Sequence, residues 1–282
     1  MKKSGLSENE IQQVEQIVRD AGEILLEYWP GKAAPTKSLG ARKKADGSTV
    51  TDADIESNTF LLEQLRQLFP EDGYFSEETD PTSDLRSKDT VWVIDPLDGT
   101  WSFSRGRPEF SVLLSRVVGN RSVFGVVYLP ALKEMFYGQV GHGAFRNGTK
   151  ISVSLQDSIR EGGLSTRNFP PSVSPLQFRE AESTCFGVRE LCTGRFDASV
   201  IRLKRHSEWD LAAYVALVEA SGGRVSDEFG NEVKFYFQPP AFSYFVCSNG
   251  LVHDRALSLI PRAPEEEYRK NSLSARYYRT NS

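Results

Sequence analysis

The sequence has few of the residues that most often carry catalysis or bind transition metals. Its 282 residues include only three cysteines and three histidines. Cys185, Cys192 and Cys247 are odd in number and show no CxxC spacing, so neither a disulfide framework nor a zinc site is indicated. The histidines stand in unrelated sequence contexts, which argues against a histidine metal site or a Ser/His/Asp triad. Any bound metal should therefore be held by oxygen atoms.

Long apolar runs and an excess of positive charge are also missing. No apolar stretch approaches the roughly 20 residues that span a bilayer, and the start of the chain lacks the apolar segment of a signal peptide. The formal net charge of -4 offers no basic surface for nucleic acid. We therefore expect a cytoplasmic enzyme that acts on a small molecule, with neither nucleic acid nor membrane as a partner.

The most informative segment that is present places two acids after an apolar run. Residues 91–94 predict a buried strand, and Asp95 and Asp98 follow at its end with a proline between them that disrupts regular pairing. Two carboxylates on such a turn can converge on one cation. Gly99 allows close backbone approach to a ligand, and N–H groups at Thr100 can hold a phosphate. The alternative interpretation is a polar turn with an Asp cap.

The rest of the chain alternates helices with short strands. A capping box at Ser7 and Glu10 begins a helix that ends near Pro30, and a second helix carries Asp52 and Asp54 in its first turn. Residue patterns predict further strands at 109–118, 124–131, 134–140, 162–169 and 242–249, and a hairpin at Asn147-Gly148. Residues 185–201 fit either a helix or a strand. A last helix is opened by Asp210 and ends at Gly222-Gly223.

We predict two coupled subdomains from this order of elements. The polar stretch 155–163 separates an N-terminal α+β part, residues 1–154, from a C-terminal α/β part, residues 155–265, and residues 266–282 are expected to be a disordered tail. Residues 31–50 predict a mobile loop whose lysines either approach an anionic ligand or lie in solvent.

Three separated motifs resemble those of the inositol monophosphatase superfamily, the magnesium-dependent and lithium-sensitive phosphatases. These are Glu77-Glu78, DPLDGT at 95–100 and WDLAA at 209–213, in this order, and the resemblance extends from about Ile11 to Gly250. It implies an α/β (α+β) fold, a layered αβαβα sandwich, and commonly a homodimer. Haloacid dehalogenase phosphatases, the nearest rival, require DxD on one strand, whereas this chain has DxxD.

The resemblance also implies the composition of the active site. Two or three Mg²⁺ ions would be bound by Glu77, Asp95, the carbonyl of Leu97, Asp98 and Asp210. A metal-bound water would attack phosphorus directly, and the catalytic residues would be Asp54, Thr100 and Glu77, of which Thr100 and Asp54 would accept the proton of that water in relay. The substrate would contact Asp98, Gly99, Thr100, Ser183, Arg202 and Asp210.

The sequence near the WD motif favours a nucleotide substrate over a polyol. Inositol monophosphatases carry a glutamate shortly before that motif to hold ring hydroxyls, and none occurs here between residues 200 and 207. The motifs look closer to 3'(2'),5'-bisphosphate nucleotidases, which remove the 3'-phosphate of 3'-phosphoadenosine 5'-phosphate. Arg202, Lys204 or Arg205 would meet the second phosphate.

Two departures from that subgroup leave other substrates open. A glycine and a lysine of its pattern are Glu182 and Phe186 here, and Ser183 remains as a possible substrate contact. Inositol phosphates and histidinol phosphate therefore stay as alternatives. A non-catalytic metal-binding relative is the alternative from another functional class.

Overall fold

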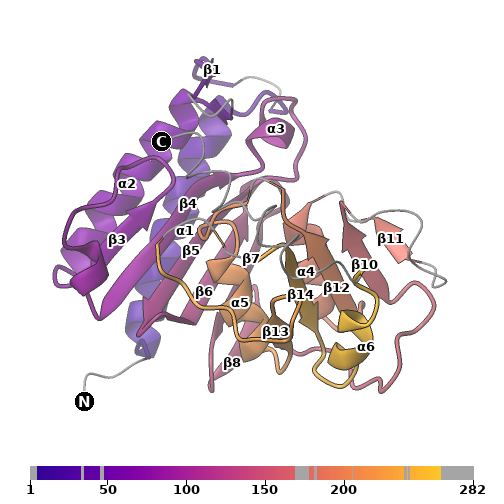
Figure 1. Ribbon diagram of the computed structural model, residues 1–282. Coiled ribbons are helices and arrows are strands. Elements are labelled where there is room, and N and C mark those ends of the chain that lie inside the picture. Colours follow the sequence, from indigo (N-terminus) through magenta and orange to yellow (C-terminus); the bar gives the residue numbers. More distant parts are fainter. Residues whose placement is uncertain are drawn as a thin grey trace, which may run out of the picture.

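The computed structural model describes residues 5–32, 35–44, 48–168, 178–180, 183–204, 206–237, 240 and 242–261. Two β-sheets alternate with three helical layers in the order helix, sheet, helix, sheet, helix (Figure 1). The predicted αβαβα sandwich is confirmed. The tail predicted at 266–282 and the side chain of Arg205 lie outside the described residues.

The first layer consists of two long helices on the outer face of the larger sheet. These are α1 (Glu8–Tyr28) and α2 (Asp52–Leu68), which pack against each other and against β4, β5 and β6. Each begins with a capping box, and that of α2 joins Thr51 to Asp54. Both predicted helices are confirmed, and the buried apolar stripe of each faces the sheet.

The larger sheet has seven strands in sequential order. It contains β3 (Gly73–Ser76), β4 (Thr90–Asp98), β5 (Ser111–Val118), β6 (Arg121–Leu129), β7 (Glu134–Gln139), β8 (Gly143–Arg146) and β9 (Thr149–Ile151). β3 and β4 are parallel, and the other neighbours are antiparallel. The strands predicted at 109–118, 124–131 and 134–140 are confirmed and follow one another in a meander. Asn147 and Gly148 turn the chain between β8 and β9 with φ angles of 48° and 78°.

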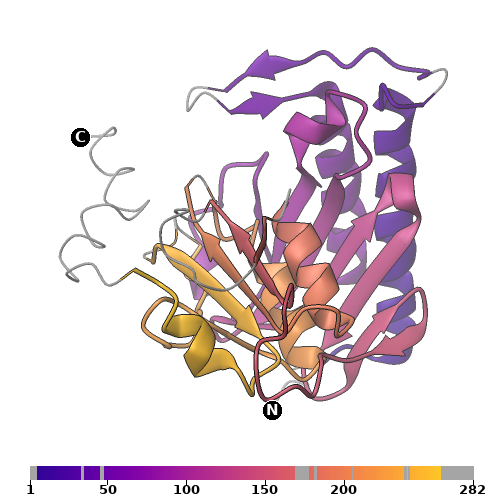
Figure 2. The same ribbon diagram turned by 90° about the vertical axis from the view of Figure 1, so that its right-hand side faces the viewer.

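Short elements lie around this sheet. They are the hairpin β1 (Arg42–Lys43) and β2 (Thr49–Val50), the four-residue helix α3 (Thr100–Phe103), and the 3₁₀ turns η1 (Leu85–Ser87) and η2 (Pro130–Leu132). The hairpin extends past the end of the sheet above α3 (Figure 2).

The smaller sheet has five strands, ordered β11-β10-β12-β14-β13. Its strands are β10 (Leu164–Arg167), β11 (Phe178–Glu180), β12 (Ala198–Arg202), β13 (Arg224–Ser226) and β14 (Tyr244–Ser248). Helices α4 (Thr184–Cys192) and α5 (Ala212–Ala220) lie between the two sheets, and α6 (His253–Leu257) covers the outer face (Figure 1). The segment 185–201, which fits either type by sequence, is therefore α4 followed by β12. The helix expected to open at Asp210 begins at Ala212.

Helix α5 packs closely against the larger sheet because small residues meet at the contact. A Cβ atom on Gly125 of β6 would lie 2.3 Å from the carbonyl oxygen of Ala213. One apolar core extends from the larger sheet across α4 and α5 to the smaller sheet. The two halves therefore share a helical layer, and their division near residue 155 stays a prediction.

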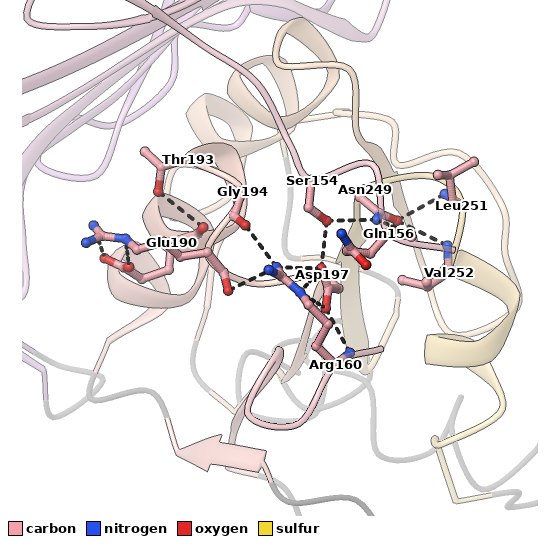
Figure 3. Close-up of polar contacts among 11 residues, drawn as sticks. Ser154, Gln156, Arg160, Glu190, Thr193, Gly194, Asp197, Asn249, Leu251 and Val252 are labelled. Atoms are coloured by element: carbon pink, nitrogen blue, oxygen red, sulfur yellow. Dashed lines mark hydrogen bonds and ion pairs between the residues drawn. The ribbon is translucent and has the colours of Figure 1, made fainter. Parts of the chain in front are cut away.

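A polar cluster joins the connection before β10 to the smaller sheet (Figure 3). The guanidinium of Arg160 donates to both oxygens of Asp197, whose side chain is fully buried. Ser154 donates to the same carboxylate at 2.6 Å, and Asn249 donates to Ser154 at 3.0 Å. This cluster fixes the crossover between the sheets.

Candidate active site

The acidic cluster begins where β4 loses its regular pairing with β5. Asp95 pairs with Leu113 and Asp98 pairs with Ser111, so β4 carries one extra residue between these pairs. Pro96 lies in this bulge and has no N–H for the ladder. The bulge brings Asp95 and Asp98 toward a common point.

Asp210 joins the cluster from the helical layer between the sheets. It lies in the turn before α5, where the N–H of Ser207 donates to its carboxylate. One oxygen atom each from Asp95, Asp98 and Asp210 lies within 4.8 Å of the other two. Asp95 is buried, and the other two are partly exposed. The structure thus brings together three of the predicted metal ligands.

Glu77 reaches the same region from the end of β3. Its N–H donates to the carbonyl of Ile94 at 3.2 Å, which extends the pairing of β3 with β4. The ammonium group of Lys44 contacts Glu77 at 2.9 Å and Glu78 at 2.5 Å. A lysine of the predicted mobile loop therefore contacts this acidic pair directly, which the sequence alone did not indicate.

Burial raises the pKa of Glu77, Asp95, Asp98 and Asp210, and neighbouring carboxylates raise the pKa of Glu77, Asp95 and Asp210 further. The pKa of Glu77 rises to about 7, chiefly through desolvation, although Lys44 opposes the shift. The pKa values of Asp95 and Asp210 rise well above their ordinary range for the same reason, followed by repulsion from nearby acids. A bound cation would relieve that repulsion, and carboxylate oxygens suit Mg²⁺. The donor set therefore fits this ion.

The turn after β4 carries the other predicted groups. The Leu97 carbonyl, a predicted metal ligand, accepts a hydrogen bond from the Thr100 hydroxyl at 3.2 Å. Gly99 has a φ of 83°, and a Cβ atom there would lie 2.8 Å from the Glu109 carbonyl oxygen, so only glycine fits. The N–H of Gly99 donates to the Asp98 carboxylate. Of the two predicted phosphate donors, Gly99 thus already supports a metal ligand.

Asp54 lies in the first turn of α2, as predicted, and caps that helix. Its carboxylate accepts the Thr51 hydroxyl at 2.5 Å and the Thr51 N–H at 2.8 Å. The side chain is buried, and desolvation raises its pKa to about 6. A carboxyl group with this pKa can gain and lose a proton near neutral pH.

A cavity of about 320 Å³ adjoins Asp98. Five of its ten lining residues are apolar, and the others include Glu109, Ser111 and Arg189. Ser183, a predicted substrate contact, lines this cavity and caps α4 by accepting the N–H of Phe186 at 3.1 Å. The apolar lining residues are Phe110, Leu129, Leu132, Cys185 and Phe186.

Arg167 of the smaller sheet, which was not predicted, interacts electrostatically with the cluster. It lowers the pKa of both Asp98 and Asp210, whose values burial raises. Arg167 pairs with Ile201 of β12, whose side chain belongs to the core between the sheets. Because side chains alternate along a strand, Arg202 starts on the opposite face, the one covered by α6. The contact of Arg202 with substrate stays a prediction, and the strand pairing favours Arg167 for the face nearer the cluster.

A second unpredicted group is the phenol of Tyr214. It donates to Asp98 at 3.2 Å from within α5, where the sequence suggested only a core helix. Nothing in the pattern of that helix distinguishes this tyrosine from a packing residue, because its partner is far away in the chain.

Residues 7–265 match the inositol monophosphatase family. The chain belongs to this family. Its members are phosphatases that are in general magnesium-dependent and lithium-sensitive, so the activity at a coarse level is phosphoric monoester hydrolysis. The structure contributes an acidic cluster that can bind the metal.

Relatives within the family differ in their named substrates. A fructose-1,6-bisphosphatase/inositol-1-monophosphatase of Thermotoga maritima is 31% identical over 261 residues, covering 89% of this chain and 95% of the relative. A histidinol-phosphatase of Chlorobaculum parvum is 32% identical, covering 77% and 85%. A 3'(2'),5'-bisphosphate nucleotidase CysQ of Salmonella typhimurium is 30% identical, covering 80% and 93%.

A solved structure of the family has the same fold. The IMPase of Thermotoga maritima superimposes with a TM-score of 0.75 at 30% identity, covering 89% of this chain and 96% of that one. Within the described part of this chain, no helix has both the length and the apolar character that crossing a bilayer requires.

Proposed function

We propose that this chain is a Mg²⁺-dependent phosphomonoesterase whose preferred substrate is 3'-phosphoadenosine 5'-phosphate, which it cleaves at the 3'-phosphate. The observation that carries the proposal is the convergence of Asp95, Asp98 and Asp210 within 4.8 Å. Buried carboxylates at this separation repel one another, so a divalent cation and the phosphate that it attracts account for their arrangement.

The predicted ligand set is retained for this ion. Asp95, Asp98 and Asp210 would bind it together with Glu77 and the Leu97 carbonyl. When bound, Mg²⁺ neutralises phosphate charge and makes a water molecule more acidic. We keep two or three ions as the expected number.

The chain's own residues would position the phosphate and accept the proton. The N–H of Thr100, at the start of α3, would donate to a phosphate oxygen, and its hydroxyl, now bonded to the Leu97 carbonyl at 3.2 Å, would orient the attacking water. Asp54 would take up the proton, for which a pKa of about 6 is suitable. As the new P–O bond forms, the ester P–O bond would break, and the alkoxide of the substrate would leave and take a proton from solvent. No covalent enzyme intermediate would form.

The cavity beside Asp98 supports a substrate that carries a flat ring. Five of its ten lining residues are apolar, and these could pack against a flat base. Phe110 and Phe186 are its aromatic lining residues, and the base would contact them. A volume of about 320 Å³ lies at the lower end of the usual range of ligand pockets. Ser183 would contact the sugar.

The second phosphate of such a substrate needs a cation. We assign this role to Arg167 in place of Arg202, because Arg167 already interacts electrostatically with Asp98 and Asp210. The relatives named for inositol monophosphate, fructose bisphosphate and histidinol phosphate keep those compounds as alternatives. A cytoplasmic homodimer stays the expectation for the whole protein, and light scattering would test the dimer.

The first test is the requirement for the metal and its ligands. Asp95→Asn and Asp210→Asn should each reduce turnover of a generic phosphomonoester to background, because each removes a negative charge that attracts the metal ion. Turnover is measured in Mg²⁺ and in EDTA, and circular dichroism confirms the fold. Asp254→Asn, which changes an exposed acid outside the site, is the matched control. Full activity of either site variant would refute the metal assignment.

The second test is substrate preference. We expect a higher kcat/KM for 3'-phosphoadenosine 5'-phosphate than for inositol 1-phosphate. Arg167→Ala should lower the ratio of these two kcat/KM values by about 10-fold or more, because a charge-assisted contact of roughly 1.5 to 3 kcal/mol is lost. Arg202→Ala removes the arginine that the sequence alone predicted to contact the substrate. It should leave the ratio of the two kcat/KM values nearly unchanged. Equal or reversed preference in the unmodified enzyme would assign the chain to the inositol phosphatases.

A further inference from the structure

The carboxylate of Asp98 is held by donors from two different layers of the protein. Ser111 of β5 donates its hydroxyl to Oδ2 at 3.3 Å, and Tyr214 of α5 donates its phenol to the same oxygen at 3.2 Å. One donor belongs to the larger sheet and the other to the helical layer between the sheets. The orientation of this carboxylate therefore depends on both.

Tyr214 occupies a position where packing alone does not require a hydroxyl group. The residue is 1% exposed, and it is the largest side chain in a helix of alanine, valine, leucine and glutamate. Its ring packs in the core that α4 and α5 share with both sheets. Phenylalanine would fill the same space, so the phenol is explained by its polar partners. These are Asp98 and Cys185, to which the phenol is also hydrogen-bonded.

Donors behind a ligand carboxylate affect how well it binds a cation. With Oδ2 held by two hydroxyl groups, rotation of the Asp98 carboxylate about its Cβ–Cγ bond is restricted, and its approach to Asp95 and Asp210 is fixed in advance. Groups of this kind typically change metal affinity by roughly 10- to 100-fold when they are removed.

We infer that Tyr214 and Ser111 are positioning residues for the cation site, which act on the ion through Asp98. Tyr214 is buried in the core, whereas Ser111 also lines the cavity beside Asp98. The inference rests on the proposed function, since it assumes that Asp98 binds a divalent ion. Beyond the proposed function, the inference is that a phenol in the helical layer between the sheets increases the affinity of the acidic cluster for the cation.

The test measures Mg²⁺ binding without substrate, by isothermal titration calorimetry of the full chain. Tyr214→Phe should raise the dissociation constant by roughly 10-fold or more while the melting temperature in EDTA changes little. Ser111→Ala removes the other donor to the same oxygen and should raise the constant in the same direction. It serves as the second variant if Tyr214→Phe does not fold.

Tyr28→Phe is the matched control. It also removes a phenol that donates to a carboxylate, at 2.5 Å to Glu56, but neither residue belongs to the cluster. Its dissociation constant should equal that of the unmodified chain. If the unmodified chain binds no Mg²⁺, the proposed function fails together with this inference. If it binds the ion and both Tyr214→Phe and Ser111→Ala bind it equally well, only the positioning role is overturned.

Discussion

The hydroxyl of Thr100 links the acidic turn to the start of α3. It donates to the Leu97 carbonyl at 3.2 Å, so it lies beside a predicted metal ligand. Thr100→Ala should lower kcat by roughly 10²-fold with little change in KM, because the variant loses proton transfer and keeps the backbone N–H. Steady-state kinetics with the preferred substrate measure both constants.

Two variants complete this experiment. Thr100→Ser keeps the hydroxyl and should retain most of the rate. Ser104→Ala removes another hydroxyl at the end of α3, one that donates to the Trp101 carbonyl at 3.1 Å, and should behave like the unmodified enzyme. A Thr100→Ala enzyme with normal kcat and a raised KM would show that the hydroxyl only holds phosphate.

At the level of single residues, the sequence revealed the groups that belong to compact motifs. Asp95 and Asp98 were predicted to converge because a proline separates them at a strand end, and the bulge in β4 brings them together. Arg167 and Tyr214 were missed because their importance depends on which strand and helix lie beside the cluster. The sequence favoured Arg202 over Arg167 for the same reason, since the side of a strand that faces the site is known only from its pairing.

The crossover before β10 depends on one ion pair between a partly exposed arginine and a buried carboxylate. Arg160→Ala would leave the carboxylate of Asp197, whose side chain is 0% exposed, without its guanidinium partner. Because the arginine is itself partly exposed, we expect a loss of about 1 to 3 kcal/mol in the free energy of unfolding, measured in urea. Arg224→Ala breaks an ion pair with the exposed Asp254 and should cost less than about 1 kcal/mol. Equal losses of unfolding free energy in the two variants would mean that water replaces the Arg160 guanidinium beside Asp197 at little cost.

The elements that the sequence predicted best have signals within their own residues. The helices α1 and α2 begin at capping boxes, and β8 and β9 join at Asn147-Gly148. The start of α5 was predicted two residues early, because Asp210 resembles a cap, whereas its carboxylate accepts the N–H of Ser207 and faces the cluster. An acid near the start of a helix can either cap the helix or face a metal site. Only the position of the neighbouring residues in space distinguishes the two roles.

The stability of the whole molecule should depend on pH in opposite ways with and without Mg²⁺. The pKa of Glu77 is raised in the folded state from its ordinary value of 4.5 to about 7, so the folded chain binds more protons than the unfolded one between these values. In EDTA the free energy of unfolding should therefore fall as the pH rises through this window, on the order of 1 kcal/mol or more. Asp95 and Asp210 act in the same direction.

Saturating Mg²⁺ should remove or reverse this decline, since the ion binds the ionised carboxylates and not the protonated ones. Thermal unfolding at several pH values, with EDTA and with Mg²⁺, measures both trends. Glu77→Gln should flatten the curve in EDTA. A stability in EDTA that rises through the window would contradict the shifted pKa values.

The layered arrangement also implies an order of events during folding. The larger sheet forms from strands that are neighbours in sequence, whereas the contact between Tyr214 and Asp98 joins positions 116 residues apart. Closing so long a loop costs entropy, and it also brings like charges together, so the docking of α5 should come late. An ion that binds only the completed cluster stabilises contacts that are absent from the folding transition state. Mg²⁺ should therefore slow the unfolding of this chain more than it accelerates its folding.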